Sequence, residues 1–132
     1  MLSAFVAALF LLVSFVVPQE KKQPAPWDIP EKYMTMENPY KDDASLLKVG
    51  KMLYSKHCKS CHGNKGAGNG PKAKQLETHC SEFAAEAFQS QGDGEMFYKS
   101  FVGRDEMPNY EKKITDDEDK WAVINYIRSM KK

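Results

Sequence analysis

The chain has 132 residues, a formal net charge of +1 and a hydrophobic fraction of 42%. This length leaves room for one small domain, which excludes a multidomain protein. The near-neutral total charge offers no support for a nucleic-acid partner, and we expect none.

The first 17 residues form an uncharged apolar stretch. Such a stretch indicates a signal peptide or a membrane anchor, and its length approaches the ~20 residues of a spanning helix. No cleavage site of small residues is visible between Ser14 and Gln19, which favours an uncleaved anchor at residues 1–17. The nearest basic residues, Lys21 and Lys22, come after the stretch, and by the positive-inside rule they favour a cytoplasmic location for the rest of the chain.

Residues 18–43 hold five of the seven prolines in a polar context. This composition is typical of an extended linker. Three aromatic residues, Trp27, Tyr33 and Tyr40, are unusual in a free linker, and they leave open that part of the segment packs along the domain instead.

A first helix is predicted from about residue 44 to residue 57. Small and apolar residues recur there at helical spacing, and Asp42 or Asp43 can cap its first turn. The helix leads directly into the next motif.

The pentapeptide Cys58-Lys59-Ser60-Cys61-His62 is the most informative part of the sequence. Cys-x-x-Cys-His is the attachment sequence of c-type haem, in which two thiols form thioethers with the porphyrin. The histidine then becomes the proximal ligand of the iron. Cys-x-x-Cys alone also occurs in zinc sites and thioredoxin-like sites, but the adjacent His62 favours haem. We therefore expect one covalent haem c and a domain that folds poorly without it.

A loop with four glycines, residues 63–71, comes after the motif. Glycine backbone can pass close to the porphyrin edge. A phosphate-binding loop is the rival interpretation, but no Gly-Lys-Ser/Thr is present after it and no strand precedes it. Cys80 is interpreted as a small, partly buried residue, with a disulfide to a partner or a reactive thiol as alternatives. We assign no role to His79.

Two further helices are predicted. One covers residues 94–102, is capped by Asp93 and ends at Gly103. The other begins after Thr115, because Thr-Asp-Asp-Glu at residues 115–118 fits a capping box and basic residues close the C-terminal end. No alternating pattern of a strand occurs, so we expect an all-α fold.

A six-coordinate haem iron needs a second axial ligand, and Met107 is the best candidate. It lies in the loop before the last helix, where Pro108 stiffens the backbone. The methionines within helices are interpreted as core residues: Met52, Met96 and Met130. Met34 and Met36, in the proline-rich segment, are weaker candidates.

These features together resemble a class I c-type cytochrome of the small bacterial type, over roughly residues 44–129. The shared features are Gly50 and Tyr54 upstream of Cys58, the haem motif, a Gly-x-Gly-Pro loop, the Met-Pro loop, and a last helix that begins Trp-Ala-Val and ends Tyr-Ile-Arg. The resemblance implies a cytochrome c-like domain, residues 44–132, with three main helices around one haem.

The resemblance also implies particular contacts. Gly50 and Tyr54 should meet the last helix near Val123 and Tyr126. The carbonyl of Pro71 should accept a hydrogen bond from the imidazole N–H of His62.

His/Met ligation closes both axial positions and raises the reduction potential. We therefore expect an electron carrier and no enzyme, with no small-molecule substrate. Its expected role is transfer between membrane respiratory complexes or dehydrogenases and a terminal acceptor. The location is the periplasmic side of a bacterial membrane, because c-type attachment takes place outside the cytoplasm, and this outweighs the position of the lysines after the apolar stretch.

Two alternatives remain. One is a fixed haem subunit of a respiratory enzyme complex. The other is a structural zinc site formed by Cys58, Cys61, Cys80 and a histidine.

The lysines are unevenly distributed along the chain. Residues 44–76 contain seven lysines and no acidic residue, giving this segment a charge of +7. Because these lysines flank the haem motif, we expect redox partners with an acidic docking surface and an association that weakens with salt. An ordinary solvated surface is the alternative.

Overall fold

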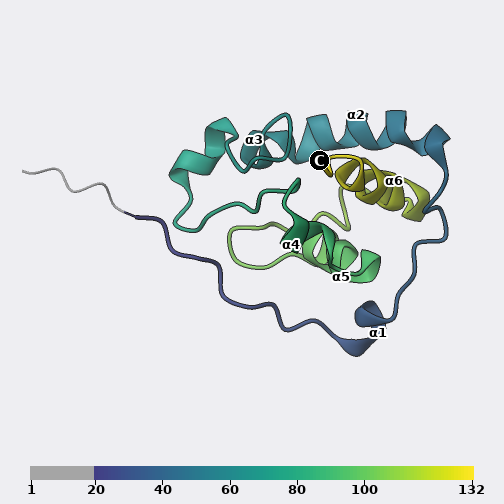
Figure 1. Cartoon of the computed structure of the whole chain (residues 1–132), viewed down its shortest axis with the longest axis horizontal. Helices are drawn as coiled ribbons and strands as arrows, with labels where there is room; N and C mark the ends of the chain where they lie inside the picture. The colour runs from purple at the N-terminus through teal and green to yellow at the C-terminus, as the bar shows by residue number, and fades with distance from the viewer. Residues whose placement is uncertain (1–19) are drawn as a thin grey trace, which may run out of the picture.

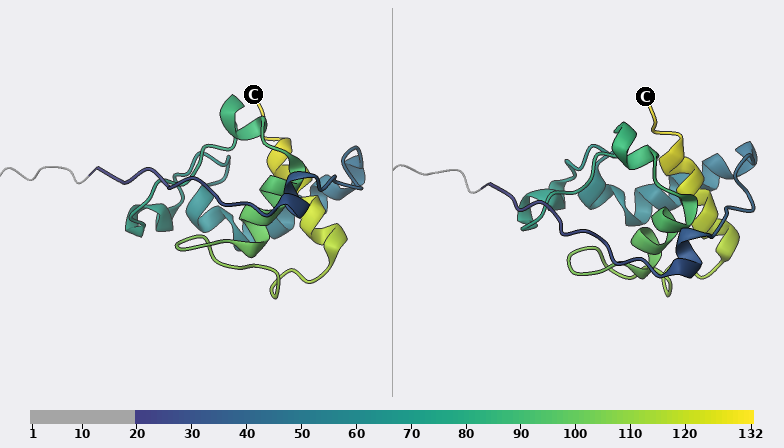
Figure 2. Two further views of the ribbon diagram at one scale, coloured as in Figure 1. Left: turned by 90° about the horizontal axis from the view of Figure 1, so that it is seen from below. Right: turned by 60° about the horizontal axis from the view of Figure 1, so that its bottom comes forward.

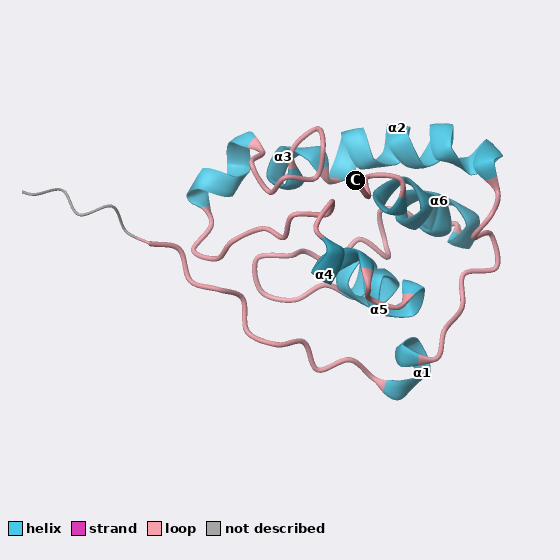
Figure 3. Ribbon diagram, viewed as in Figure 1, coloured by secondary structure: helices cyan, strands magenta, loops and turns pink. Residues whose placement is uncertain are grey.

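A computed structural model describes residues 20–132, so the predicted signal or anchor at residues 1–17 lies outside the described residues. The helical elements, shown in Figures 1 and 3, are α1 (Glu31–Met34), η1 (Ala44–Leu46), α2 (Leu47–His57), α3 (Lys59–His62), η2 (Pro71–Gln75), α4 (Glu86–Gln89), α5 (Asp93–Phe97), η3 (Tyr98–Val102) and α6 (Asp117–Arg128). The only β-pairing in this part of the chain is two isolated bridges. The all-α expectation is confirmed. No helix within residues 20–132 combines the length and the apolar character needed to cross a bilayer.

The start of the first predicted helix is capped as expected. The carboxylate of Asp43 accepts a hydrogen bond from the backbone N–H of Ser45. The chain makes one 3₁₀ turn, η1, and then continues as α2 to His57.

The two later helices differ from the prediction at their starts. The N-cap of α5 is Gly92, one residue before Asp93, and the Glu95 carboxylate accepts from the Gly92 N–H at 2.8 Å. The expected helix then changes at Tyr98 into the π-helical turn η3, which ends at Gly103 with φ 68°. In α6 the N-cap is Asp116 and not Thr115, because the Asp116 carboxylate reaches the free N–H groups of the first turn.

α2 and α6 pack against each other at the upper edge of the domain in Figure 1. A Cβ on Gly50 would lie 2.0 Å from the carbonyl oxygen of Ala122 and 2.9 Å from Cβ of Tyr126. The rings of Tyr54 and Tyr126 pack with centroids 5.3 Å apart. The structure thus forms the close helix crossing that the resemblance implied.

The buried core consists of apolar residues from α2, α5, η3 and α6 and their connections. Met96 is a core residue as predicted, with 1% of its surface exposed. The same prediction is wrong for Met52, which is 61% exposed. Met52 lies on the face of α2 that points away from α6, where no described element covers it.

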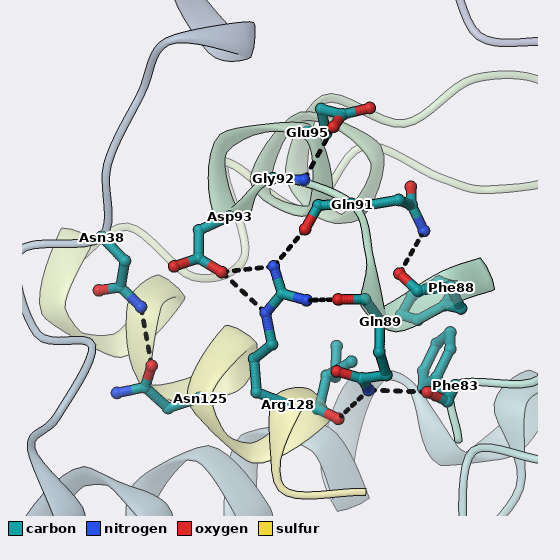
Figure 4. Close-up of polar contacts among 11 residues, drawn as sticks. Asn38, Phe83, Phe88, Gln89, Gln91, Gly92, Asp93, Glu95, Asn125 and Arg128 are labelled. Atoms are coloured by element: carbon teal, nitrogen blue, oxygen red, sulfur yellow. Dashed lines mark hydrogen bonds and ion pairs between the residues drawn. The ribbon is translucent and has the colours of Figure 1, made fainter. Parts of the chain in front are cut away.

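Residues 20–43 lie against the helical domain: they follow its lower edge as far as α1 in Figure 1, and in the left view of Figure 2 they cross the middle of the domain. Trp27 meets Tyr98 edge-on at 6.2 Å, and Tyr33 contacts the same ring at 4.8 Å. Asn38 donates to the buried amide of Asn125 in α6 at 2.7 Å, as Figure 4 shows. The sequence left open whether this segment is a free linker or packs along the domain. Its described residues pack along the domain.

Candidate haem site

The haem motif lies where the chain changes direction at the end of α2. The N–H of Cys58 still bonds to the Tyr54 carbonyl at 2.8 Å, and α3 then adds a single turn. Gly63 ends that turn with φ 80°, and its carbonyl accepts from the Tyr54 hydroxyl at 2.6 Å. Cys58 and Cys61 are free thiols. Positions three apart on a helical turn share one face, so both sulfurs can reach the same macrocycle.

A cavity lies beside the motif and holds about 1070 Å³ of empty space including its mouth. Its wall is made by four main parts of the chain: residues 24–27, the haem motif, residues 76–83 and residues 104–110. Cys58, Cys61, His62 and Met107 all face this one cavity. Pro71 lies outside it, at the start of η2.

His62 is held by aromatic stacking. Its ring lies 4.5 Å from the ring of Phe83 with an interplanar angle of 27°. Burial lowers the pKa of His62 to about 4, so the imidazole is neutral near pH 7, which is the form that binds iron. The thiol of Cys58 is also buried, and burial together with Cys61 raises its pKa to about 12.

The Nδ1 atom of His62 is buried and has no hydrogen-bond partner among the described residues. The hydrogen bond to the carbonyl of Pro71 implied by the resemblance is therefore not formed in this structure. Pro71 opens the 3₁₀ helix η2, in which carbonyls point along the helix axis. The ring of His62 is therefore held in this structure by its stack on Phe83 and not by a hydrogen bond.

The backbone of Phe83 is fixed by polar contacts that could not be predicted from the sequence. The buried side chain of Gln89 donates to the carbonyls of Phe83 at 2.7 Å and Ile127 at 3.1 Å. Arg128 in turn donates to the Gln89 carbonyl at 2.5 Å and pairs with Asp93 (Figure 4). This network connects α6 to the ring that stacks on His62.

Met107 lies in a tight turn on the cavity wall. The N–H groups of Arg104 and Met107 donate to each other's carbonyls, both at 2.8 Å. Asp105 within the turn has φ 45°, a left-handed conformation that Asp tolerates better than most residues. Beyond the turn, the Tyr110 hydroxyl donates to the carbonyl of His57 at 3.0 Å and ties the loop to α2.

Among the candidate methionines, Met96 and Met107 line the cavity. Met34 is 53% exposed and Met52 61% exposed, which removes both as ligands in this arrangement. Met96 is fixed within the core by α5, whereas Met107 comes from a loop aimed at the cavity.

His79, to which the sequence assigned no role, and Cys80 are both part of the cavity wall. Cys80 is partly buried as predicted, and burial raises the pKa of its thiol. A Cβ on Gly68 would lie 2.4 Å from the Cys80 carbonyl oxygen. Elsewhere in the loop, a Cβ on Gly70 would lie 2.4 Å from the Ser60 carbonyl oxygen and one on Gly66 2.7 Å from the Phe83 ring, so these glycines leave room for other protein groups.

No group of three or more His, Cys, Asp or Glu side chains within residues 20–132 is arranged to hold a metal ion. The described residues thus offer no tetrahedral zinc site, which removes the zinc alternative. A Cys-x-x-Cys-His motif on the wall of a largely apolar cavity fits haem attachment instead.

The sequence profile of the family Cytochrome c matches residues 47–131. The chain belongs to the cytochrome c family. Cys58 and Cys61 are accordingly its covalent attachment residues for haem c, with His62 beside them. No curated protein matches the chain.

Solved structures of c-type cytochromes have the same fold. The c-type cytochrome KustC0563 is 30% identical with a TM-score of 0.54, covering 63% of this chain and 98% of its own. A chain of the Kuenenia stuttgartiensis reducing HAO-like protein complex Kustc0457/Kustc0458 is 22% identical with a TM-score of 0.60, covering 67% of this chain and 45% of its own. Cytochrome cL from the marine methylotroph Methylophaga aminisulfidivorans is 20% identical with a TM-score of 0.56, covering 77% and 69% respectively. The last two similarities support the fold alone.

Proposed function

We propose that this cytochrome c is a one-electron carrier whose haem iron is ligated by His62 and Met107. The observation that carries the proposal is that the Met107 turn faces the same cavity as Cys58, Cys61 and His62. The haem supplies the redox chemistry, since its iron takes up and releases one electron. The protein supplies attachment through the two cysteines, a neutral imidazole and a thioether sulfur.

The surrounding residues favour transfer over catalysis. Phe83 and Phe88 make the wall beside His62 apolar, and a low local dielectric disfavours a net charge on the cofactor. With both axial positions filled by side chains, a substrate would have no open position at the iron. We therefore propose no enzymatic activity.

The ligation can be tested with two methionine variants. Met107→Ala should keep the haem through denaturation, lose the methionine-to-iron charge-transfer band and lower the reduction potential. Met96→Leu conserves volume at the buried competitor and should retain both properties. The opposite pattern would make Met96 the ligand.

We propose that the partners dock on the lysine-rich side through acidic groups. Lys59 and Lys65 are exposed and border a shallow hollow beside the motif, together with Asn64 and Asn69. Opposite charges steer partners into transient complexes, and salt screens this attraction.

Charge reversal tests the docking side. Lys59→Glu and Lys65→Glu should slow reduction by the physiological partner more than Lys41→Glu, an exposed lysine that precedes α2 at its end remote from the motif. Lys120 is a poor control because it pairs with Asp117 at 2.7 Å and is largely buried. A rate independent of salt, or equal losses at all three sites, would exclude this docking side.

A fixed haem subunit of a larger redox enzyme is the second candidate. It is favoured by the occurrence of the same fold in a chain of the reducing HAO-like complex. Purification in mild detergent separates the two, because a carrier elutes alone and a subunit elutes with its enzyme. We place the haem domain on the extracytoplasmic side of a bacterial membrane, with residues 1–17 as its signal or anchor.

A further inference from the structure

The segment that precedes the family match forms part of the cofactor cavity. We call residues 20–36 the strap. Pro24, Ala25 and Trp27 of the strap line the cavity, although the Cytochrome c profile begins only at residue 47. Figure 2 shows the strap running across the side of the domain near the loop that carries Met107.

Arg104 fastens the strap to the domain. Its guanidinium group donates to the carbonyls of Ala25 and Pro26, the latter at 2.6 Å. The same group lies 3.9 Å from the centroid of the Trp27 ring, within the range of a cation–π contact. One arginine therefore contacts three consecutive strap residues: its N–H groups bond to the first two, and its guanidinium plane lies over the ring of the third.

The backbone of Arg104 also closes the Met107 turn. The paired hydrogen bonds between Arg104 and Met107 mean that a shift of one residue moves the other. The strap and the proposed axial ligand thus share a single anchor residue.

A second connection lies on the other side of the turn, at the residue before Met107. The Glu106 carboxylate accepts hydrogen bonds from the N–H groups of Glu77 and Thr78, at 2.9 and 3.0 Å, and from the Thr78 hydroxyl at 2.7 Å. The strap pairs with this same segment, because Lys22 donates to the Glu77 carbonyl at 3.1 Å. Arg104 and Glu106 are therefore both tied to the strap, one directly and one through residues 77–79.

We propose that the strap positions Met107, with Arg104 and Trp27 as the positioning residues. The strap keeps the Met107 turn closed over the cavity, so that the thioether stays in place and external ligands are kept out. This inference rests on the proposed His62/Met107 ligation. Its readout is the ease with which an added ligand displaces methionine, which a merely structural contact would leave unchanged.

The test uses the full-length ferric haem protein and imidazole as the added ligand. Trp27→Ala and Arg104→Gln should each raise the apparent affinity for imidazole about tenfold, equivalent to ~1.4 kcal/mol. Arg104→Lys keeps the charge without the planar fork and should give a smaller increase. Gln23→Ala, an exposed strap residue, is the matched control and should leave the affinity unchanged.

Three outcomes decide the proposal. If chemical denaturation shows that Trp27→Ala and Arg104→Gln are less stable but their imidazole affinity equals that of the parent, the strap only stabilises the fold and the proposal is overturned. If Arg104→Gln shifts the reduction potential with unchanged imidazole affinity, Arg104 acts on the charge of the cofactor and not on Met107, which also overturns it. A tenfold rise in both variants supports it.

The ligation itself is tested separately. Met107→Ala should bind imidazole more tightly than any strap variant, and adding Trp27→Ala to it should give no further gain, because the two changes act on one equilibrium. If Met107→Ala leaves the affinity unchanged, the proposed ligation fails whatever the strap variants show.

Discussion

Replacing Gly50 by alanine tests the helix crossing on which the domain depends. The added methyl group would lie 2.0 Å from the Ala122 carbonyl oxygen and 2.6 Å from its carbonyl carbon, which are backbone atoms that cannot rotate away. The two helices must therefore separate. Overpacking of a core typically costs ~1–3 kcal/mol, and a clash with backbone belongs at the upper end. Better helix propensity returns up to ~1 kcal/mol. The net loss is then about 2 kcal/mol.

The assay is thermal and urea denaturation of the holoprotein. For a domain of this size, a loss of about 2 kcal/mol corresponds to a Tm lower by about 8 °C or more. Gly92→Ala is the matched control, because the nearest atom to its added Cβ is the flexible Glu95 carboxylate at 3.4 Å and its φ is −65°. That variant should stay within about 0.5 kcal/mol. Equal stability of the Gly50 variant and the parent would refute the reasoning.

Further predictions concern the polar support of the site and the attachment chemistry. Gln89→Leu leaves the Phe83 carbonyl unpaired in the interior. The free energy of unfolding in urea should therefore fall by ~1–3 kcal/mol. An unchanged value would show that this network does not stabilise the fold. Alanine at both Cys58 and Cys61 should leave no haem on the denatured protein in acid acetone. Cys80→Ser should keep the full mass of protein plus haem, and loss of that mass would show that Cys80 takes part in attachment.

The parts of the site carried by short motifs were predictable from the sequence. Cys58, Cys61 and His62 are close together in the chain, so their spacing alone identifies the chemistry. The contact of Gly50 with the last helix was implied by the resemblance to class I c-type cytochromes, in which a glycine stands at this distance before the haem motif. Both features are recognised from residues at short, fixed spacings along the chain.

Other parts depend on contacts between distant residues and could not be inferred from a local pattern. Arg104 reaches Ala25 across 79 positions, and no periodicity links the two. Met52 was expected in the core because it is a methionine within a helix, yet it lies on the face of α2 that no described element covers. Thr115 and Asp116 are both good caps, and the choice between them was made by the path of the chain into α6.

The central claim, a closed His62/Met107 haem that carries electrons, is tested most directly by exposing the ferrous protein to carbon monoxide. If both axial positions are filled by side chains, the absorption spectrum should stay that of the low-spin ferrous protein at neutral pH. Rapid and stoichiometric formation of a carbon monoxide adduct would show an open sixth position and would contradict the account.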